Sequence, residues 1–365
     1  MANFLNQQID VYDATADISR ATTPPSSWYT HREFSILETD TVFTNNWILV
    51  ARTDQLEEKG QYVATEVSGE PIVIVRDDKL RAFYNVCQHH AAAVMQGEGK
   101  ARAMHCPYHG WTYNLDGSLR STPQFEGAKG FDPACNGLKP VRVDIFEKFV
   151  FVCLDESAPD LENFLGGMKE KFKPLQLDKL QFYQRVEYEL DCNWKVFVDN
   201  YLDGGYHVPI LHSDLNSAIN YKDYRVELED RYCLQSCPMA ENNDVNSVRK
   251  GTDALYFWLY PNVMFNFYDG ILDTNLTIPV SENKCKVIFD YYFVDEPEQD
   301  ENFKKRSIEL AHQVQMEDES ICLSVQRGLS SRAYETGRLS PEKEAGEQLF
   351  HRLLHKDFLG HHNLV

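Results

Sequence analysis

The chain has 365 residues, of which 43% are hydrophobic and 25% are charged, and its formal net charge is −20. This composition is typical of a soluble globular protein and the length suits two domains, whereas the acidic balance argues against a nucleic-acid partner, because phosphate binding needs clustered Lys and Arg. The nine cysteines are scattered, which argues against a secreted disulfide scaffold and favours a reducing compartment.

The first 44 residues are expected to form a helical lead that packs on the larger, C-terminal domain. A Pro- and Ser-rich connection at 22–27 precedes a predicted amphipathic helix over 32–43. The N-terminus has no basic segment followed by a long apolar run, and no later stretch is long enough to span a bilayer. We therefore expect no membrane partner, and a cytoplasmic protein, or one of an organelle stroma if a transit peptide has been removed.

Residues 45–155 are expected to form a small antiparallel β domain. Short β-branched and aromatic runs, such as 71–75 and 149–152, alternate with Gly, Asp and Lys turns. Inside this region lies a motif in two halves, Cys87-Gln88-His89 and, after sixteen residues, Cys106-Pro107-Tyr108-His109. Each half is expected at the tip of a hairpin.

Each half of this motif offers one thiolate and one imidazole. Two Cys on one iron and two His on the other are the ligands of a Rieske [2Fe–2S] cluster, which passes single electrons. A structural zinc site is the alternative, because zinc accepts the same four ligands. Zinc fingers of that type usually pair Cys with Cys and His with His, however, so the mixed loops favour the cluster. The predicted cluster ligands are Cys87, His89, Cys106 and His109.

Residues 156–365 are expected to form the larger domain of an α+β protein. After a helical stretch, strands and loops should alternate from about 182 to 293 and build an antiparallel sheet. The acidic segment 295–301 suits the positive N-terminal end of a helix. A long C-terminal helix is then predicted from apolar residues that recur at roughly helical spacing, namely Phe303, Ile308, Leu310, Val314, Ile321 and Val325.

A second metal site is indicated by His207 and His212, which are five positions apart. A regular helix would turn them about 140° from each other, so we expect a bend at Pro209, which removes a helical donor. Paired histidines often satisfy only ordinary hydrogen bonds. A carboxylate from the late helix would complete the 2-His-1-carboxylate face of non-haem Fe(II), although these acids taken alone read as surface charges: Glu317, Asp318 and Glu319.

The order of these features resembles the α-subunits of Rieske non-haem iron oxygenases over nearly the whole chain. The resemblance implies a Rieske domain ahead of a helix-grip-like catalytic domain, with His207, His212 and Asp318 binding the mononuclear iron and Asp203 linking the two metal centres. Many ring-hydroxylating members carry the linking acid three residues before the first iron histidine, where this chain has Gly204. Asp199 is kept as a substitute for Asp203.

Within that family the likeness is to choline monooxygenase and related oxygenases of quaternary ammonium compounds. It implies hydroxylation of choline to betaine aldehyde as its hydrate, with O2 and with electrons from NAD(P)H through a reductase or ferredoxin, in a homotrimer. The alternatives are carnitine or glycine betaine oxidation with C–N cleavage, or ring hydroxylation. The segments that carry the likeness are Thr23–Thr30, Asp199–Asp203, Tyr206–Pro209, Leu272–Leu276 and Val325–Leu329.

Two functions of other classes are kept as alternatives. A pure Rieske electron carrier would leave the long C-terminal region and its histidines unexplained, and a zinc-stapled binding protein would lack the visible absorption of a cluster.

A small cationic substrate calls for aromatic faces, because a trimethylammonium group cannot donate hydrogen bonds. Strand alternation lets only one face of each strand look inward, and aromatic residues in strands more often form core. The candidates are Phe257, Trp258, Tyr260, Phe265, Phe267 and Tyr268.

Overall fold

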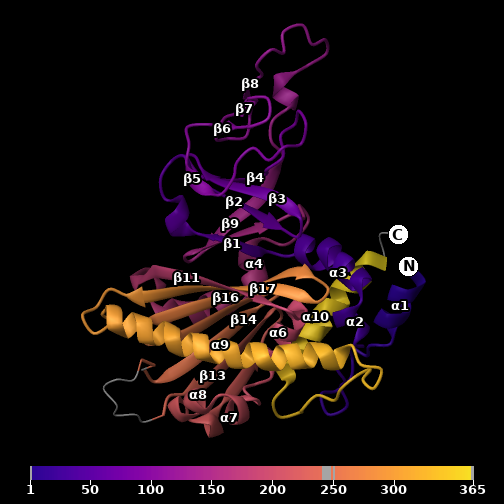
Figure 1. The fold of residues 1–365 in the computed structure, drawn as a ribbon, viewed down its shortest axis with the longest axis vertical. Coiled ribbons are helices and arrows are strands. Elements are labelled where there is room, and N and C mark those ends of the chain that lie inside the picture. The colour runs from indigo at the N-terminus through magenta and orange to yellow at the C-terminus, as the bar shows by residue number, and fades with distance from the viewer. Residues whose placement is uncertain (1, 241–247, 250, 363–365) are drawn as a thin grey trace. The chain divides into compact units, whose positions relative to one another are not determined.

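The computed structural model describes residues 2–240, 248–249 and 251–362. The chain separates into two compact units, one of residues 43–164 and one that joins residues 1–42 to 165–365. The predicted α+β class is confirmed, with a β-rich unit ahead of a larger unit that carries a long C-terminal helix (Figure 1). Residues 156–164, predicted as the start of the C-terminal domain, belong to the β-rich unit.

The β-rich unit contains a seven-stranded antiparallel sheet in the order β1-β10-β9-β4-β3-β2-β5 and a three-stranded sheet β6-β7-β8. The β-branched run of β3 is fully buried, which confirms the strand predicted at 71–75. The strands are β1 (Ile48–Arg52), β2 (Gln61–Val67), β3 (Glu70–Arg76), β4 (Leu80–Tyr84), β5 (Glu98–Lys100), β6 (Met104–His105), β7 (Thr112–Tyr113), β8 (Leu119–Ser121), β9 (Pro140–Phe146) and β10 (Phe149–Cys153). Short helices are η2 (Thr53–Leu56) and η3 (Pro133–Cys135), and α4 (Leu161–Leu165) lies at the boundary of the unit.

The larger unit is built on a second seven-stranded antiparallel sheet in the order β11-β17-β16-β15-β14-β13-β12. From β12 onward each strand pairs with the next along the chain, and β11 closes the order beside β17. The strands are β11 (Leu180–Leu190), β12 (Arg225–Leu228), β13 (Tyr232–Pro238), β14 (Asp253–Leu259), β15 (Val263–Tyr268), β16 (Ile271–Ser281) and β17 (Lys284–Val294).

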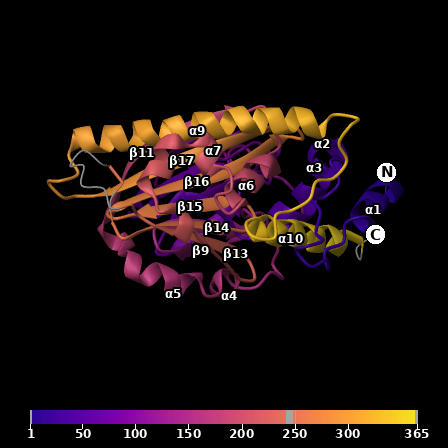
Figure 2. The ribbon, with the colours of Figure 1, turned by 90° about the horizontal axis from the view of Figure 1, so that it is seen from below.

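Helices cover this sheet, and α9 lies along its strands in both views (Figures 1 and 2). Tyr188 of β11 and His312 of α9 are joined by a hydrogen bond of 3.0 Å between Oη and Nδ1. The helices of the unit are α1 (Ala2–Asp10), α2 (Ser27–Thr30), α3 (Arg32–Glu38), the π-helical η1 (Thr39–Phe43) at the unit boundary, α5 (Met168–Phe172), η4 (Lys173–Leu175), η5 (Leu177–Lys179), α6 (Trp194–Leu202), α7 (Val208–Leu211), α8 (Ser213–Ala218), η6 (Tyr221–Asp223), α9 (Glu301–Leu329) and α10 (Ala345–His362).

The long helix predicted after the acidic segment is confirmed as α9, and Asp300 caps it by accepting the N–H of Phe303 at 2.8 Å. The apolar residues whose spacing indicated this helix are not all buried, since Ile321 and Val325 are 39% and 43% exposed. Polar residues take inward positions instead. Gln326 is buried and accepts the backbone N–H of Asn193 at 2.8 Å. A polar residue is therefore buried on this helix because it satisfies a backbone N–H group of the segment that packs beside it.

The N-terminal lead is joined to the larger unit through Glu38 at the end of α3. Its buried carboxylate accepts the indole N–H of Trp194 at 2.7 Å and forms an ion pair with Lys195, which is 0% exposed. The helix predicted over 32–43 ends at Glu38 and continues as a π-helical turn. The ion pair therefore joins the end of α3 to the start of α6, the helix that precedes His207 and His212 in the chain.

Replacement of Glu38 by Ala is expected to lower the free energy of unfolding by about 3–5 kcal/mol, because it leaves the ammonium of Lys195 buried without its carboxylate. Urea unfolding followed by fluorescence measures the change. Glu309→Ala, which removes an exposed acid of α9, serves as the control and should change the free energy by less than about 0.5 kcal/mol. An equally small effect of Glu38→Ala would mean that Lys195 finds another partner.

Candidate metal centres

The first half of the Cys/His motif lies in the loop between β4 and β5, and the second half forms the β6–β7 hairpin, in which Met104 pairs with Tyr113. The predicted hairpin is therefore confirmed for the second half and wrong for the first. The reason is the pairing of the flanking strands, since β4 pairs with β3 and β9 whereas β5 pairs with β2. The two loops nonetheless meet.

The two cysteine side chains are buried and interact directly with each other. Cys87 and Cys106 are 2% and 3% exposed, and both belong to the same core cluster. Burial raises the pKa of the Cys106 thiol, while the backbone N–H groups of Tyr108 and His109 point at it and oppose that rise. The N–H groups of a tight loop thus face the sulfur, as a thiolate bound to a cluster requires.

The two histidine side chains lie beside each other at the same place. The rings of His89 and His109 are 4.7 Å apart, and Trp111 stacks on His89 at 4.7 Å with an interplanar angle of 4°. Nδ1 of His89 is buried and has no hydrogen-bond partner among the described residues. A buried ring nitrogen without a partner is costly unless it binds something else. His90 also brings a ring nitrogen within 4.8 Å of those of His89 and His109.

The two histidines of the second site follow a sharp turn after α6. Helix α6 ends at Leu202, and Gly204 and Gly205 adopt φ angles of +67° and +69°, which favour glycine. The expected break at Pro209 is wrong. Pro209 lies in the first turn of α7, where a missing N–H is tolerated. The chain instead leaves the helical path at His212, which separates α7 from α8.

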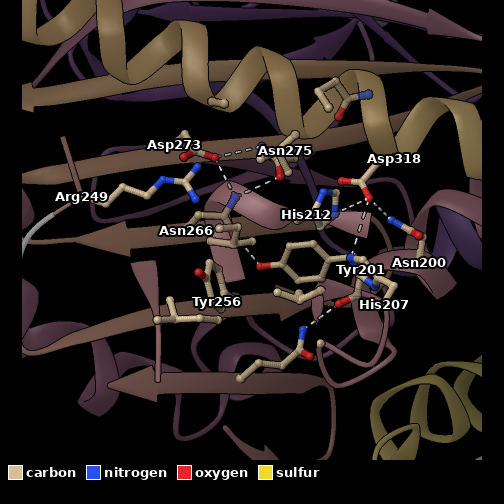
Figure 3. A pocket seen from close by; sticks show the side chains of 18 of the residues that line it. Asn200, Tyr201, His207, His212, Arg249, Tyr256, Asn266, Asp273, Asn275 and Asp318 are labelled. Atoms are coloured by element: carbon tan, nitrogen blue, oxygen red, sulfur yellow. Dashed lines mark hydrogen bonds and ion pairs between the residues drawn. The ribbon is translucent and has the colours of Figure 1, made fainter. Parts of the chain in front are cut away.

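His207, His212 and Asp318 offer three ligand atoms that all lie within 4.8 Å of one another. Oδ1 of Asp318, on α9, is 3.0 Å from Nε2 of His212 and 3.7 Å from Nε2 of His207 (Figure 3). Asn200 of α6 donates its amide to the same oxygen at 2.8 Å. The set has the composition of a 2-His-1-carboxylate face.

Two further carboxylates hold the rings of these histidines at their Nδ1 atoms. Asp203 is 2.6 Å from Nδ1 of His207, and Glu317 is 2.6 Å from Nδ1 of His212. Burial lowers the pKa of His212, but Asp318 and Glu317 outweigh it and the pKa is raised. Each Nε2 is thereby directed toward Asp318, which is how outer carboxylates orient metal-binding imidazoles. The sequence offered Glu317 as an alternative ligand but did not reveal this pairing, nor the contact of Asn200.

The acid beside the first histidine comes from position 203 because position 204 has no room for a side chain. A Cβ atom on Gly204 would clash with the backbone carbonyl of Lys343, and its φ angle is unfavourable for any other residue. Oδ2 of Asp203 also accepts the backbone N–H of His207 at 2.9 Å, which holds the carboxylate in place.

Asp199, the substitute for Asp203, is engaged elsewhere. It accepts the hydroxyl of Tyr29 at 2.7 Å and lies 2.9 Å from Nε2 of His351. Glu347 joins this group, and burial followed by repulsion from Asp199 raises its pKa. Asp199 is thus bound into a separate buried cluster with α2 and α10.

A cavity beside His207, His212 and Asp318 is lined by four tyrosines, which are Tyr201, Tyr224, Tyr256 and Tyr268. Of the six aromatic candidates predicted from the sequence, Tyr268 alone lines it. Phe257, Phe265 and Phe267 pack instead against Phe172, on the opposite face of the sheet, as strand alternation dictates. Trp258 and Tyr260 are fully buried and contact Phe350 of α10.

Within the described part of the chain, no helix combines the length and the apolar character that a membrane crossing requires.

Comparison with known proteins matches residues 46–132 to the Rieske [2Fe–2S] domain and residues 177–356 to the catalytic domain of ring hydroxylating alpha subunits. The chain is 38% identical to the chloroplastic choline monooxygenase of Arabidopsis thaliana, over 96% of this chain and 86% of that one. It is 34% identical to the carnitine monooxygenase oxygenase subunit of Escherichia coli K12, over 94% of this chain and 96% of that one.

The structure is also similar to solved structures of oxygenases. A quaternary ammonium Rieske monooxygenase in complex with L-carnitine is similar with a TM-score of 0.83 and 31% identity, over 94% of this chain and 97% of that one. A naphthalene 1,2-dioxygenase from Rhodococcus sp. has a TM-score of 0.80 at 20% identity, over 98% of each chain, and shares the fold.

Proposed function

Because the chain belongs to the Rieske non-haem iron monooxygenases, we propose that it hydroxylates choline to betaine aldehyde, as its hydrate. The observation that carries the proposal is the position of His207, His212 and Asp318 at a cavity lined by tyrosines, which suit a quaternary ammonium group. Choline monooxygenases of five plants, at 34–38% identity, support choline as the substrate. Carnitine and glycine betaine are the second candidates.

Four residues of the β-rich unit are proposed to hold the cluster, namely Cys87, His89, Cys106 and His109. The buried Nδ1 of His89, which has no hydrogen-bond partner among the described residues, fits a bond to iron. The cluster of this family supplies one electron at a time, drawn from NAD(P)H through a partner protein. A reductase or a ferredoxin would serve as that partner.

The mononuclear iron is proposed to bind His207, His212 and Asp318, and such a site provides open positions for O2. Asp203 and Glu317 accept hydrogen bonds at the two Nδ1 atoms, so that each Nε2 would be free to offer its lone pair to the metal. Asn200 orients Asp318. Asp203 is proposed to connect this site to the cluster of a neighbouring subunit in a homotrimer.

The protein is proposed to act in the cytoplasm, or in an organelle stroma once a transit peptide has been removed. The Arabidopsis relative is named as chloroplastic.

A single-turnover assay tests the proposal without a known reductase. Pre-reduced protein is mixed with O2 and choline, carnitine, glycine betaine or an aromatic acid, and the products are identified by mass spectrometry. Betaine aldehyde from choline is the expected result. Release of an amine from carnitine or glycine betaine, without a product from choline, would replace the proposal by the C–N-cleaving alternative.

Replacement of Asp203 by Asn is expected to keep both metals but to slow reoxidation of the reduced cluster about 100-fold when substrate and O2 are present, because the amide loses the charge that binds Nδ1–H of His207. Stopped-flow absorbance measures this rate. Asp178→Asn, at an exposed acid of η5, is the control. Wild-type rates in Asp203→Asn would make Asp203 a structural residue, and Asp199 would be tested next.

A further inference from the structure

Two opposite charges lie at the end of the cavity away from the histidines. Figure 3 shows Asp318 and His212 toward one side, and Asp273, Arg249 and Tyr256 toward the other. A substrate in this cavity therefore presents one end to the proposed iron ligands and the other end to the two charges.

Asp273 lies on β16, in the segment Leu272–Leu276 that the sequence analysis singled out. The residue is 5% exposed, and its Oδ1 accepts the side-chain amide N–H groups of Asn266 at 2.6 Å and Asn275 at 3.1 Å. Asn266 faces Asp273 across the β15–β16 pair and is itself fixed by the hydroxyl of Tyr201 at 2.7 Å. Both of these hydrogen-bond donors to Asp273 are neutral amides that hold the carboxylate in place, and the cation that interacts with it electrostatically is Arg249.

Aromatic rings complete this end of the cavity. The rings of Tyr256 and Tyr268 are 6.0 Å apart at an angle of 79°, and their hydroxyls are hydrogen-bonded to each other at 3.2 Å. Tyr224 stacks beside Tyr256 at 6.5 Å. The hydroxyls of Tyr256 and Tyr268 are thus engaged with each other, and the ring surfaces that line the cavity suit the methyl groups of an ammonium ion.

Arg249 brings a positive charge to the same end, with its guanidinium 4.7 Å above the ring of Tyr268. The two charges favour opposite orientations of a substrate. Asp273 favours an ammonium group at this end, which places the alcohol carbon of choline beside the iron ligands. Arg249 favours a carboxylate at this end. A betaine bound in that way would place its ammonium group beside the proposed iron ligands.

We infer that Asp273 is the specificity-determining residue that binds the ammonium group of the substrate and sets its orientation, with Arg249 as an opposing charge. The inference rests on the proposed function. It follows that removing the charge of Asp273 weakens the binding of a cationic substrate, whereas removing the charge of Arg249 does not.

The test uses a pair of substrates that differ in one charge, choline and its neutral isostere 3,3-dimethylbutan-1-ol. The half-saturating concentration of each is measured in single turnovers of the pre-reduced holoenzyme. In Asp273→Asn the value for choline should rise about 30-fold, while that for the isostere should change less than about 3-fold. In Arg249→Gln the value for choline should stay the same or fall.

Equal losses for choline and the isostere in Asp273→Asn would overturn the inference, and so would weaker choline binding in Arg249→Gln. If Asp273→Asn loses the Rieske absorption, that variant has not folded as the holoenzyme. The inference is then decided by the half-saturating concentrations of choline and the isostere in Arg249→Gln. If the wild-type protein oxidises a betaine and not choline, the proposed function fails. The inference then stands only if Asp273→Asn weakens the binding of that betaine and Arg249→Gln does not.

Discussion

Replacement of Asp318 by Ala is expected to abolish product formation, by at least about 1000-fold, while the absorption of the Rieske cluster stays intact. The loss follows because, among the residues that the structure describes, Asp318 is the one carboxylate whose oxygen lies within reach of Nε2 of both His207 and His212. Two imidazoles alone would not complete the 2-His-1-carboxylate face. Single turnover of the pre-reduced protein measures the loss, and iron analysis should show the mononuclear iron missing.

Glu319→Ala is the matched control, because it removes the neighbouring acid of α9, which has no contact with either histidine ring in the described structure. This variant should retain turnover. A fully active Asp318→Ala protein would remove Asp318 from the site and assign its place to Glu317, the other carboxylate beside His212.

Replacement of Cys106 by Ser is expected to bleach the protein and to abolish turnover, because the buried thiol pair of Cys87 and Cys106 loses one sulfur. Visible absorbance, the electron paramagnetic resonance of the reduced protein and acid-labile sulfide report the loss. Cys135→Ser is the control, since Cys135 is the exposed free thiol of the same unit, and it should leave all three signals unchanged.

The competing interpretation of this motif is a zinc site, and the same purification decides between them. Wild-type protein that binds zinc, and that contains no acid-labile sulfide after anaerobic reconstitution, would contradict the cluster. The motif would then hold no redox-active metal to pass single electrons, and the proposed oxygenase reaction would fail with it.

The chemistry of the two centres could be predicted from the sequence because ligand character belongs to the side chain itself. Cys106 and His207 carry their donor atoms wherever the chain places them, so spacing and order sufficed to propose them. Helix α9 was predictable for a similar reason, since its acidic start and its apolar spacing are local properties.

The partners of those residues were not predictable, because they depend on contacts between distant segments. Glu317 meets His212 across 105 positions of sequence, and Asn200 meets Asp318 across 118. The prediction of the aromatic residues that line the cavity was mostly wrong for a different reason. A dense aromatic run does not reveal which face of its strands looks into the cavity, and here Tyr256 and Tyr268 face it while Phe257 does not.

The glycine pair after α6 restricts how this site can change during evolution. Relatives that place the acid at the position of Gly204 cannot be reached from this chain by one substitution, because an acid there meets the carbonyl of Lys343 and a disfavoured backbone angle. The loop before α10 would have to move first, and the chain would then pass through a form with two acids or with none. An acid three residues before His207 therefore requires a rearranged backbone and not only a changed side chain, and a residue role transferred to that position would fall on a glycine.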